Sequence, residues 1–293
     1  MTRNALAVLA HGNLALYISC GPFFYLFPFV VLARLAGRRI LLDFRDPWSV
    51  NIRNRYSETP AGGSGRNLWK AWLSECIEVF AYRRCVKFIV CTPGMRDAYA
   101  ALLGDDRRIV VMPNGFDFDD DLYNWRKSTY EPIPGTRRFV CLGKFAEYGK
   151  GADVKARRVL ERLRGIRDEL GITIHIDFVG SDPQINGKLA QECGLSDSVT
   201  FRSRLAYEEA IRIAALSDTA IMIVRNEDLD FGTKVFDYIG LGLPILDAFD
   251  RTKGFYKYFK EVMLAGGVVP ASTRRRFSRD SVYAEHVRVF EVA

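Results

Sequence analysis

The stretch FGTKVFDYIGLGLPIL, residues 231–246, places groups that bind phosphate beside a group that binds hydroxyls. A helix is predicted to begin around Gly232, Thr233 and Lys234, and the first amides of a helix are free to bind phosphate. Asp237 lies one turn further on, where a carboxylate accepts hydrogen bonds from sugar hydroxyls. The pattern indicates a nucleotide or nucleotide-sugar site. In the alternative interpretation, Thr233 caps the helix and Asp237 offsets its dipole.

Two further loops follow predicted strands and supply cations and glycine turns. The loop LGKFAEYGKG contains Gly143, Lys144 and Lys150, and the loop GSDP begins at Gly180. Ligands of open α/β sheets bind at the carboxyl ends of the strands. We therefore predict that the three loops face one crevice, where Lys144, Lys150 and Lys234 point at the same anion.

The elements that must position these loops alternate along the chain. Strands are predicted at 14–19, 40–44, 88–92, 109–113, 138–143, 174–180, 199–203, 220–224 and 244–249, with helices such as 67–84, 151–170 and 207–216 between them. This alternation predicts an α/β fold with parallel sheets and crossover helices. A polar stretch with two prolines and a glycine indicates a linker at 128–137, between units at 1–127 and 138–293.

Composition and charge narrow the class of protein. The 293 residues carry a net charge of +7, and residues 1–127 hold 17 Lys/Arg against 12 Asp/Glu. The basic N-terminal part favours an anionic membrane surface or an anionic acceptor. The sequence contains no basic helix interleaved with stacking aromatics, so nucleic acid is a less favoured partner. The six cysteines form no CxxC pair, which fits a reducing cytoplasm and predicts no zinc site.

The apolar stretch 14–36 is broken by Ser-Cys-Gly-Pro and again by Pro28. We favour a buried strand at 14–19, a turn and a hydrophobic helix at about 22–36 over a membrane span. Such a helix, followed by Arg38 and Arg39, is also able to lie on a membrane surface. The start MTRNALAVLA is apolar enough for a signal peptide, but His-Gly-Asn cuts the run short, so this reading is disfavoured.

The ordered motifs LGKFAEYGKG, IDFVGSDP, FRSRLAYEEAIRIAALSD and FGTKVFDYIGLGLPIL resemble the C-terminal domain of family 4 glycosyltransferases. The motifs DFRDPWS and VMPNGFD in the first part are similar to that family as well. The resemblance covers about residues 14–250. It implies the GT-B fold of two Rossmann-like domains and retaining transfer from a nucleotide-sugar, with no essential metal and no other cofactor. Family members usually have further elements before this chain's first residue, so the acceptor-side domain (1–127) is expected to be shortened and incomplete.

The resemblance assigns functions to individual positions. Lys144 and Lys150 match the family's basic residues on the donor diphosphate, and are the predicted catalytic residues. Asp237 matches the second of two spaced carboxylates, the one that holds the donor ribose. The first carboxylate position falls on Leu229, which is flanked by two aspartates and departs from the family pattern. The other predicted donor-binding residues are Gly143, Gly180, Gly232, Thr233 and Lys234. The predicted acceptor or cleft residues are Asp43, Arg45, Asp46 and Trp48, for which a structural salt bridge with Trp packing is the alternative.

These matches predict a hexosyltransferase that uses a UDP- or GDP-linked sugar and a glycan or lipid-linked acceptor. The expected setting is cell-surface polysaccharide or glycoconjugate assembly in the cytoplasm, peripheral to the inner face of the membrane. One alternative is a non-catalytic nucleotide-binding or partner subunit of the same fold. Another is a sugar-nucleotide epimerase, which needs acid/base groups in the cleft, where His11, His175 and His286 are not expected.

Overall fold

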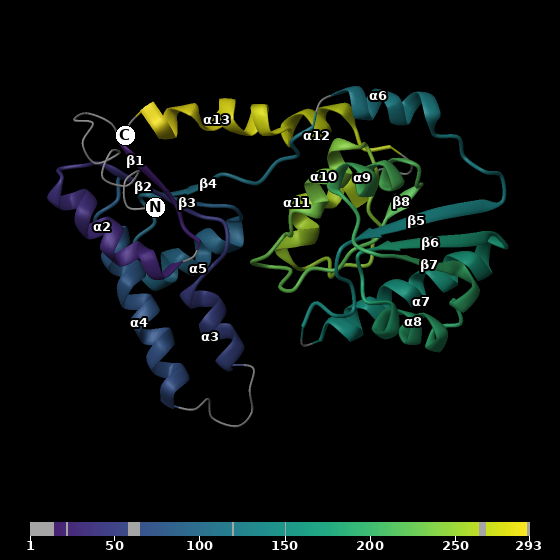
Figure 1. Ribbon diagram of the computed structural model, residues 1–293, viewed down its shortest axis with the longest axis horizontal. Helices are drawn as coiled ribbons and strands as arrows, with labels where there is room; N and C mark the ends of the chain where they lie inside the picture. Colours follow the sequence, from purple (N-terminus) through teal and green to yellow (C-terminus); the bar gives the residue numbers. More distant parts are fainter. Residues whose placement is uncertain are drawn as a thin grey trace. The chain divides into compact units, whose positions relative to one another are not determined.

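The computed structural model describes residues 15–21, 23–57, 65–118, 120–149, 151–263 and 268–291. The chain divides into two compact units (Figure 1). Unit 1 is Met1–Pro113 with Tyr283–Ala293, and unit 2 is Asn114–Val282. Each unit contains one parallel four-stranded sheet. The predicted α/β class with two Rossmann-like domains is confirmed.

Unit 1 has the strand order β1-β2-β3-β4. Its strands are β1 (Leu16–Ser19), β2 (Ile40–Phe44), β3 (Lys87–Val90) and β4 (Ile109–Val111). Its helices are η1 (Phe23–Tyr25), α2 (Leu26–Leu35), α3 (Ser49–Ser57), α4 (Gly65–Tyr82) and α5 (Pro93–Leu103). Every residue of β2 is buried, as expected for a central strand of a parallel sheet.

Unit 2 has the strand order β7-β6-β5-β8. Its strands are β5 (Thr136–Leu142), β6 (Thr173–Val179), β7 (Val199–Arg202) and β8 (Thr219–Ala220). Its helices are α6 (Asp120–Thr129), α7 (Ala152–Leu170), α8 (Pro183–Glu192), η2 (Ser196–Ser198), α9 (Tyr207–Ala215), α10 (Lys234–Gly240), α11 (Gly254–Met263) and α12 (Ala271–Arg276). Helix α13 (Arg279–Glu291) begins in unit 2, and its residues from Tyr283 onward belong to unit 1.

The sheet of unit 2 is buried on both faces. Along β5, Phe139 and Cys141 belong to one core cluster, and Val140 and Leu142 belong to the other. Helices α7 and α8 cover the first face, whereas α9 and α10 cover the second (Figure 1). This arrangement exposes the ends of the strands and the loops that follow them.

The predicted strands at 14–19, 40–44, 88–92, 109–113, 138–143, 174–180 and 199–203 correspond to β1–β7 within two residues at each end. The last two predicted strands, 220–224 and 244–249, are longer than what pairs in the structure. Only Thr219–Ala220 pairs as a strand from the segment 220–224, and 244–249 contributes an isolated bridge between Ala220 and Ile245. The Ile221 N–H still donates to Val140 O, and residues 220–224 continue to alternate between the two core clusters, although the paired ladder itself ends at Ala220.

The boundary between the units lies between Pro113 and Asn114, before the predicted linker at 128–137. Helix α6 packs on unit 2, since Trp125 lies against its core and the Arg126 guanidinium donates to Ser217 O at 2.9 Å. These contacts attach residues 120–129 to the second sheet, whereas the sequence pattern placed most of them with the first.

The apolar stretch 14–36 forms β1, η1 and α2, as predicted for a strand, a turn and a hydrophobic helix. Within the ranges that the structure describes, no helix has the length and apolar character needed to cross a membrane. The segment read as a possible signal peptide, MTRNALAVLA, and His11 lie outside the described residues.

Candidate functional site

A pocket of about 400 Å³ opens at the carboxyl ends of β5 and β6 in unit 2. Its polar and glycine lining consists of Gly143, Lys144, Gly180, Arg204, Tyr207 and Lys234, and its apolar wall comes from strand ends and α9. Four of these residues were predicted from sequence as parts of one donor site. The structure brings their three loops to a single pocket.

The floor of the pocket is made by two glycine turns. Gly143 and Gly180 have φ values of 83° and 80°, which side chains rarely adopt. The Gly143 N–H donates to Val179 O at 2.8 Å, and the Gly180 N–H donates to Arg202 O at 3.0 Å. Both strands therefore end in fixed turns with no side chain filling the space above them, and a ligand is able to approach the backbone closely.

The loop that carries Lys144 is held in place by a carboxylate. Glu147 accepts hydrogen bonds from the N–H groups of Phe145 (3.1 Å) and Asp182 (2.9 Å) and from the Asn186 amide (2.8 Å). These contacts attach the loop to the beginning of α8. Lys144 is thus presented from an anchored loop, whereas the second predicted cation of this loop, Lys150, lies outside the described residues.

Asp237 lies beside the pocket with both carboxylate oxygens engaged. One accepts from the Tyr207 hydroxyl at 2.7 Å, and the other from Lys234 Nζ at 3.3 Å. The residue is only 8% exposed. Burial raises the pKa of Asp237, and the nearby Lys234 charge opposes that shift. Each oxygen has a second lone pair, so the carboxylate is still able to accept a hydrogen bond from a ligand hydroxyl.

Helix α10 begins at Lys234, within the start predicted at residues 232–234. Thr233 stands at the N-cap position but makes no side-chain cap hydrogen bond, so its predicted alternative function as a cap is not observed. Gly232 has a φ of 65°, and its N–H donates to Asp230 at 2.9 Å. These contacts direct the chain into α10 with Lys234 as its first residue.

Sequence reasoning missed Arg204 and Tyr207. Both follow β7, within a motif used only for the family resemblance. The rule that ligands bind after the carboxyl end of each strand applies to β7 as it does to β5 and β6. Reading that loop in the same way would have added Arg204 to the predicted cations.

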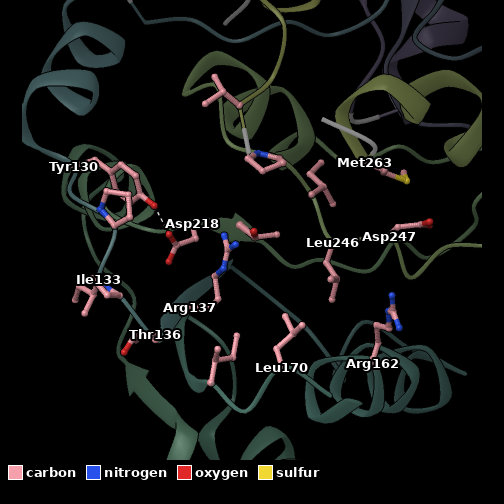
Figure 2. A pocket seen from close by; sticks show the side chains of 18 residues that line it. Tyr130, Ile133, Thr136, Arg137, Arg162, Leu170, Asp218, Leu246, Asp247 and Met263 are labelled. Atoms are coloured by element: carbon pink, nitrogen blue, oxygen red, sulfur yellow. Dashed lines mark hydrogen bonds between the residues drawn. The ribbon is translucent and has the colours of Figure 1, made fainter. Parts of the chain in front are cut away.

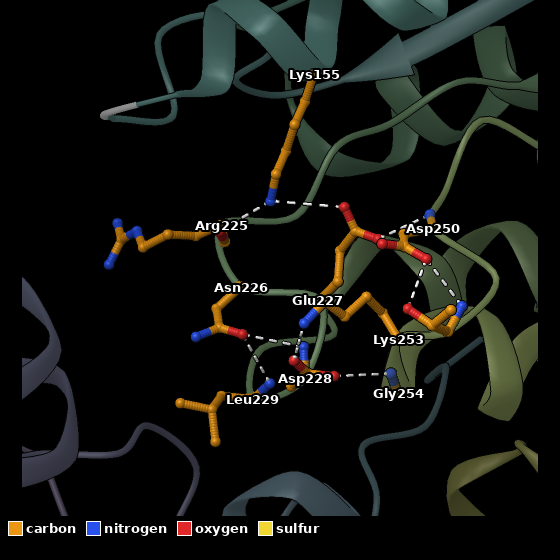
Figure 3. Close-up of polar contacts among 10 residues, drawn as sticks. Lys155, Arg225, Asn226, Glu227, Asp228, Leu229, Asp250, Lys253 and Gly254 are labelled. Atoms are coloured by element: carbon orange, nitrogen blue, oxygen red, sulfur yellow. Dashed lines mark hydrogen bonds and ion pairs between the residues drawn. The ribbon is translucent and has the colours of Figure 1, made fainter. Parts of the chain in front are cut away.

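The loop before α10 forms its own network (Figure 3). Leu229, at the position of the missing first carboxylate, is buried. Glu227, two residues earlier, is nearly buried and lies 3.6 Å from Lys155 Nζ, while it also accepts from the Asp250 N–H at 3.1 Å. Lys155 Nζ also donates to Val224 O at 2.9 Å. Glu227 thus serves to shape the loop.

The two aspartates that flank Leu229 are also engaged. Asp228 pairs with Lys253 at 2.9 Å and accepts from the Gly254 N–H at 3.0 Å, and Asp230 accepts from Gly232. Over the described part of the chain, no three His, Cys, Asp or Glu side chains gather into a possible metal site.

In unit 1, Asp43 and Arg45 form the salt bridge that was weighed against an acceptor function. Asp43 is buried at the end of β2, 2.8 Å from Arg45 Nε, and it also accepts a hydrogen bond from the Tyr17 hydroxyl. The Arg45 guanidinium donates to Met112 O at 3.0 Å. Of the four predicted acceptor residues, only Asp46 is exposed.

Trp48 is packed as well. Its ring stacks on Phe23, with centroids 5.1 Å apart, and its backbone N–H donates to the Tyr99 hydroxyl at 3.1 Å. That hydroxyl donates to the fully buried Glu78 at 2.7 Å, and Glu78 accepts from the N–H and hydroxyl of Ser49 as well. Burial raises the pKa of Glu78 to about 7. The turn after β2 is therefore anchored on a buried carboxyl group.

A larger cavity of about 770 Å³ lies at the amino ends of the unit 2 strands (Figure 2). Its lining includes Thr136 at the start of β5 and Ile172 just before β6, together with the exposed apolar Ile133 and Leu170. It lies at the end of the sheet opposite to the three glycine loops. Since ligands of such sheets bind at the carboxyl ends, the smaller pocket is the candidate site.

Comparison with solved structures shows which fold the chain shares. The chain resembles the solved structure of HepE from Anabaena bound to UDP, with a TM-score of 0.60, 14% identity, and coverage of 100% of this chain and 82% of that one. It resembles sucrose-phosphate synthase from Thermosynechococcus elongatus, with a TM-score of 0.56, 12% identity, and coverage of 98% and 75%. It also resembles UDP-GlcNAc 2-epimerase from Methanocaldococcus jannaschii, with a TM-score of 0.51, 11% identity, and coverage of 100% and 80%.

At these identities the likeness shows the fold, which is the GT-B arrangement of two Rossmann-like domains. Residues 3–115 match the model of the glycosyl transferase 4-like domain. The predicted resemblance to family 4 glycosyltransferases is confirmed by this match, which covers residues 3–115, and by the shared GT-B fold. The comparison with curated protein sequences found no match.

Proposed function

We propose that this chain transfers a hexose from a UDP- or GDP-linked sugar to a glycan or lipid-linked acceptor, with retention of configuration and without an essential metal. The observation that carries the proposal is the pocket after β5 and β6, where Lys144, Arg204 and Lys234 surround a backbone floor and Asp237 lies at the side. Cations suit a diphosphate, and a carboxylate suits the ribose hydroxyls.

In the proposed reaction, the bond between the sugar C1 and the diphosphate oxygen breaks as C1 bonds to the acceptor oxygen. The acceptor hydroxyl proton passes to the leaving diphosphate. Charge therefore develops on the diphosphate, where Lys144 and Lys234 are placed to stabilise it. Lys150 is proposed as a further cation from the same loop as Lys144. Removing one such group commonly costs on the order of 3 kcal/mol of barrier, or about a hundredfold in rate.

A second candidate is a nucleotide-binding subunit without turnover. It is favoured by unit 1, where Asp43, Arg45 and Trp48 are all engaged in internal contacts. An epimerase is disfavoured, because neither described histidine lines the pocket: His175 lies 3.6 Å from Asp177 on β6, and His286 Nε2 lies 2.9 Å from Val111 O.

Isothermal titration of the full chain with UDP, GDP, ADP and their glucose derivatives tests the donor site. We expect one nucleotide to bind in the micromolar range. Lys144→Ala and Lys150→Ala should each weaken binding about tenfold or more, because each removes a charge-assisted contact. Lys188→Ala, an exposed lysine on α8 outside the pocket, is the matched control.

The outcomes separate the candidates. Binding that is weakened by both lysine variants supports the donor site, and release of nucleotide from the sugar in the presence of an acceptor extract supports transfer. Binding without any turnover favours the subunit. A folded protein that binds none of the nucleotides contradicts the donor-site proposal altogether.

We further propose that the reaction serves cell-surface polysaccharide or glycoconjugate assembly at the cytoplasmic face of the membrane. All six cysteines are free thiols, and five of them are buried. A reducing compartment keeps such thiols intact.

A further inference from the structure

Helices α2 and α4 of unit 1 each turn an apolar face outward. In a soluble domain, outward faces are expected to be polar. The exposed apolar side chains that matter here are Phe27, Leu32 and Leu35 on α2 and Trp69, Trp72 and Leu73 on α4. We call this set the α2–α4 surface.

The outward face of α4 follows from helical spacing. Its inward face carries Ala71, Ser74 and Glu78, which are buried at intervals of three and four residues. Trp69 and Trp72 lie on the opposite side, 56% and 59% exposed. Two large aromatic rings are thus held in water on a helix whose other face already fills the core.

Helix α2 repeats the pattern. Leu26, Val30 and Ala33 are buried against the sheet, whereas Leu32 and Leu35 point outward, and Leu35 is 81% exposed. The sequence LFPFVVLARL offers no polar residue for that face before Arg34. The helix is apolar around most of its circumference, although only one side of it is covered.

The two faces are continuous. The Phe27 ring of α2 lies 5.0 Å from the Phe80 ring of α4, centroid to centroid. Phe80 lies seven residues after Leu73 and eleven after Trp69, so the three side chains are on the same side of α4. The Arg84 guanidinium lies 3.6 Å above the Phe80 ring. Apolar side chains therefore run from one helix to the other, with a cation at the junction.

The exposed charged side chains around the α2–α4 surface are all positive. Across residues 23–39 and 68–84, every charged side chain that is exposed is a cation: Arg34, Arg39, Lys70, Arg83 and Arg84. The two acidic residues in these ranges are withdrawn, since Glu75 pairs with Arg53 and Glu78 is buried.

We propose that the α2–α4 surface docks on an anionic lipid bilayer, with the two tryptophans in the headgroup region and the cations on lipid phosphates. Tryptophan is amphipathic and favours the boundary between water and lipid. Each cation near an anionic bilayer surface adds attraction that salt weakens. The apolar side chains supply the burial that fixes the protein there. This proposal does not rest on the donor site, and it gives a lipid-linked acceptor a surface on which to meet the chain.

Charge argues against a second copy of the chain as the occupant. A two-fold interface places the same surface on both partners, so the rim of cations would face another rim of cations. An anionic bilayer is complementary to both the apolar centre and the basic rim.

The test is co-sedimentation of the full chain with vesicles. Vesicles of phosphatidylcholine alone are compared with vesicles that contain about 30 mol% phosphatidylglycerol, at low and high salt. We expect binding to the anionic vesicles, and a loss of most of it at high salt. The double variant Trp69→Ser/Trp72→Ser should bind at least tenfold more weakly, because it removes the two interfacial rings.

A matched control removes apolar side chains that are similarly exposed in unit 2. Leu170→Ser/Ile185→Ser changes residues that are 64% and 47% exposed and should leave vesicle binding unchanged. Thermal unfolding of both double variants shows whether each retains the fold. Tryptophan fluorescence quenched by bromine-labelled lipid in the wild type, and not in the Trp69/Trp72 variant, places the rings in the bilayer.

Three results would overturn the proposal. The first is equal binding of wild type and the folded tryptophan variant. The second is absence of binding to anionic vesicles by the folded wild type. The third is a concentration-dependent dimer that is abolished by the tryptophan variant, since a second copy would then cover the surface. Nucleotide binding in the same preparations is measured separately, so failure of the donor site and failure of membrane docking are distinguishable.

Discussion

Asp237 is the residue proposed to bind the ribose, and Asp237→Asn removes its charge while keeping its shape. The substitution keeps the size of the side chain and one acceptor oxygen. A hydrogen bond to a charged acceptor contributes about 1.5–3 kcal/mol, and one to a neutral acceptor about 1 kcal/mol. With two ribose hydroxyls bound, the expected loss is roughly 2–3 kcal/mol, which corresponds to a 30- to 150-fold rise in Kd.

The same variant has a pH signature. Because burial raises the pKa of Asp237, its carboxylate takes up a proton at a higher pH than an exposed aspartate does. Affinity of the wild type should therefore fall as pH is lowered through that raised pKa, and affinity of the variant should not. UDP-glucose is the suitable ligand, since both of its phosphates stay ionised over that range.

The stability of the wild type should change with pH in the direction opposite to its affinity. A carboxyl group with a raised pKa in the folded state holds its proton more tightly there than in the unfolded chain. Its ionisation above that pKa weakens the fold. Asn at this position carries no charge to bury, so the free energy of unfolding at neutral pH should be unchanged or higher.

Titration calorimetry of the wild type, Asp237→Asn and the control Asp197→Asn, an exposed residue of η2, measures these effects. The control should match the wild type at every pH. The reasoning is refuted if UDP-glucose binds the wild type and binds Asp237→Asn within about threefold of it, or if the pH dependence survives in the variant.

Three further predictions concern stability, measured by denaturant unfolding. Glu78 has its pKa raised from 4.5 to about 7, so stability should fall by about 3 kcal/mol as pH rises across that window, and Glu78→Gln should abolish the slope. Gly240→Ala would place a Cβ 2.6 Å from Phe116 Cγ and should cost about 1–3 kcal/mol, whereas no loss would show that the ring moves freely. Lys155→Met leaves the nearly buried Glu227 without its ion partner and should cost about 1–2 kcal/mol, after allowance for the partial exposure of Lys155; an unchanged midpoint contradicts this.

Local patterns in the sequence were enough to predict the sheets and the loops that matter. Apolar runs of strand length alternate with amphipathic helices, and that periodicity is set by neighbouring residues. Gly143 and Gly180 were identified because they follow strands, and their positive φ values show why glycine stands there. The carboxyl-end rule predicts Lys144 and Lys234 in one pocket, and both line it.

Pairings between distant segments were decided only by the tertiary structure. Nothing near Asp237 in the sequence indicates that Tyr207, thirty positions earlier, donates to it. The sequence left Trp48 open between a ligand contact and packing, and in the structure it packs on Phe23 and is tied through Tyr99 to a buried carboxyl group. Such contacts depend on which distant segments of a unit the folded chain brings together.

The division of the chain into units has the same origin. The sequence pattern placed most of helix α6 with the first unit, but one face of it is held by unit 2 through Trp125 and Arg126. Helix α13 is divided between the units at Tyr283. The local order of apolar and polar residues sets which segments form helices and strands. Membership of a core depends on which surfaces meet after folding, and a linear pattern does not carry that information.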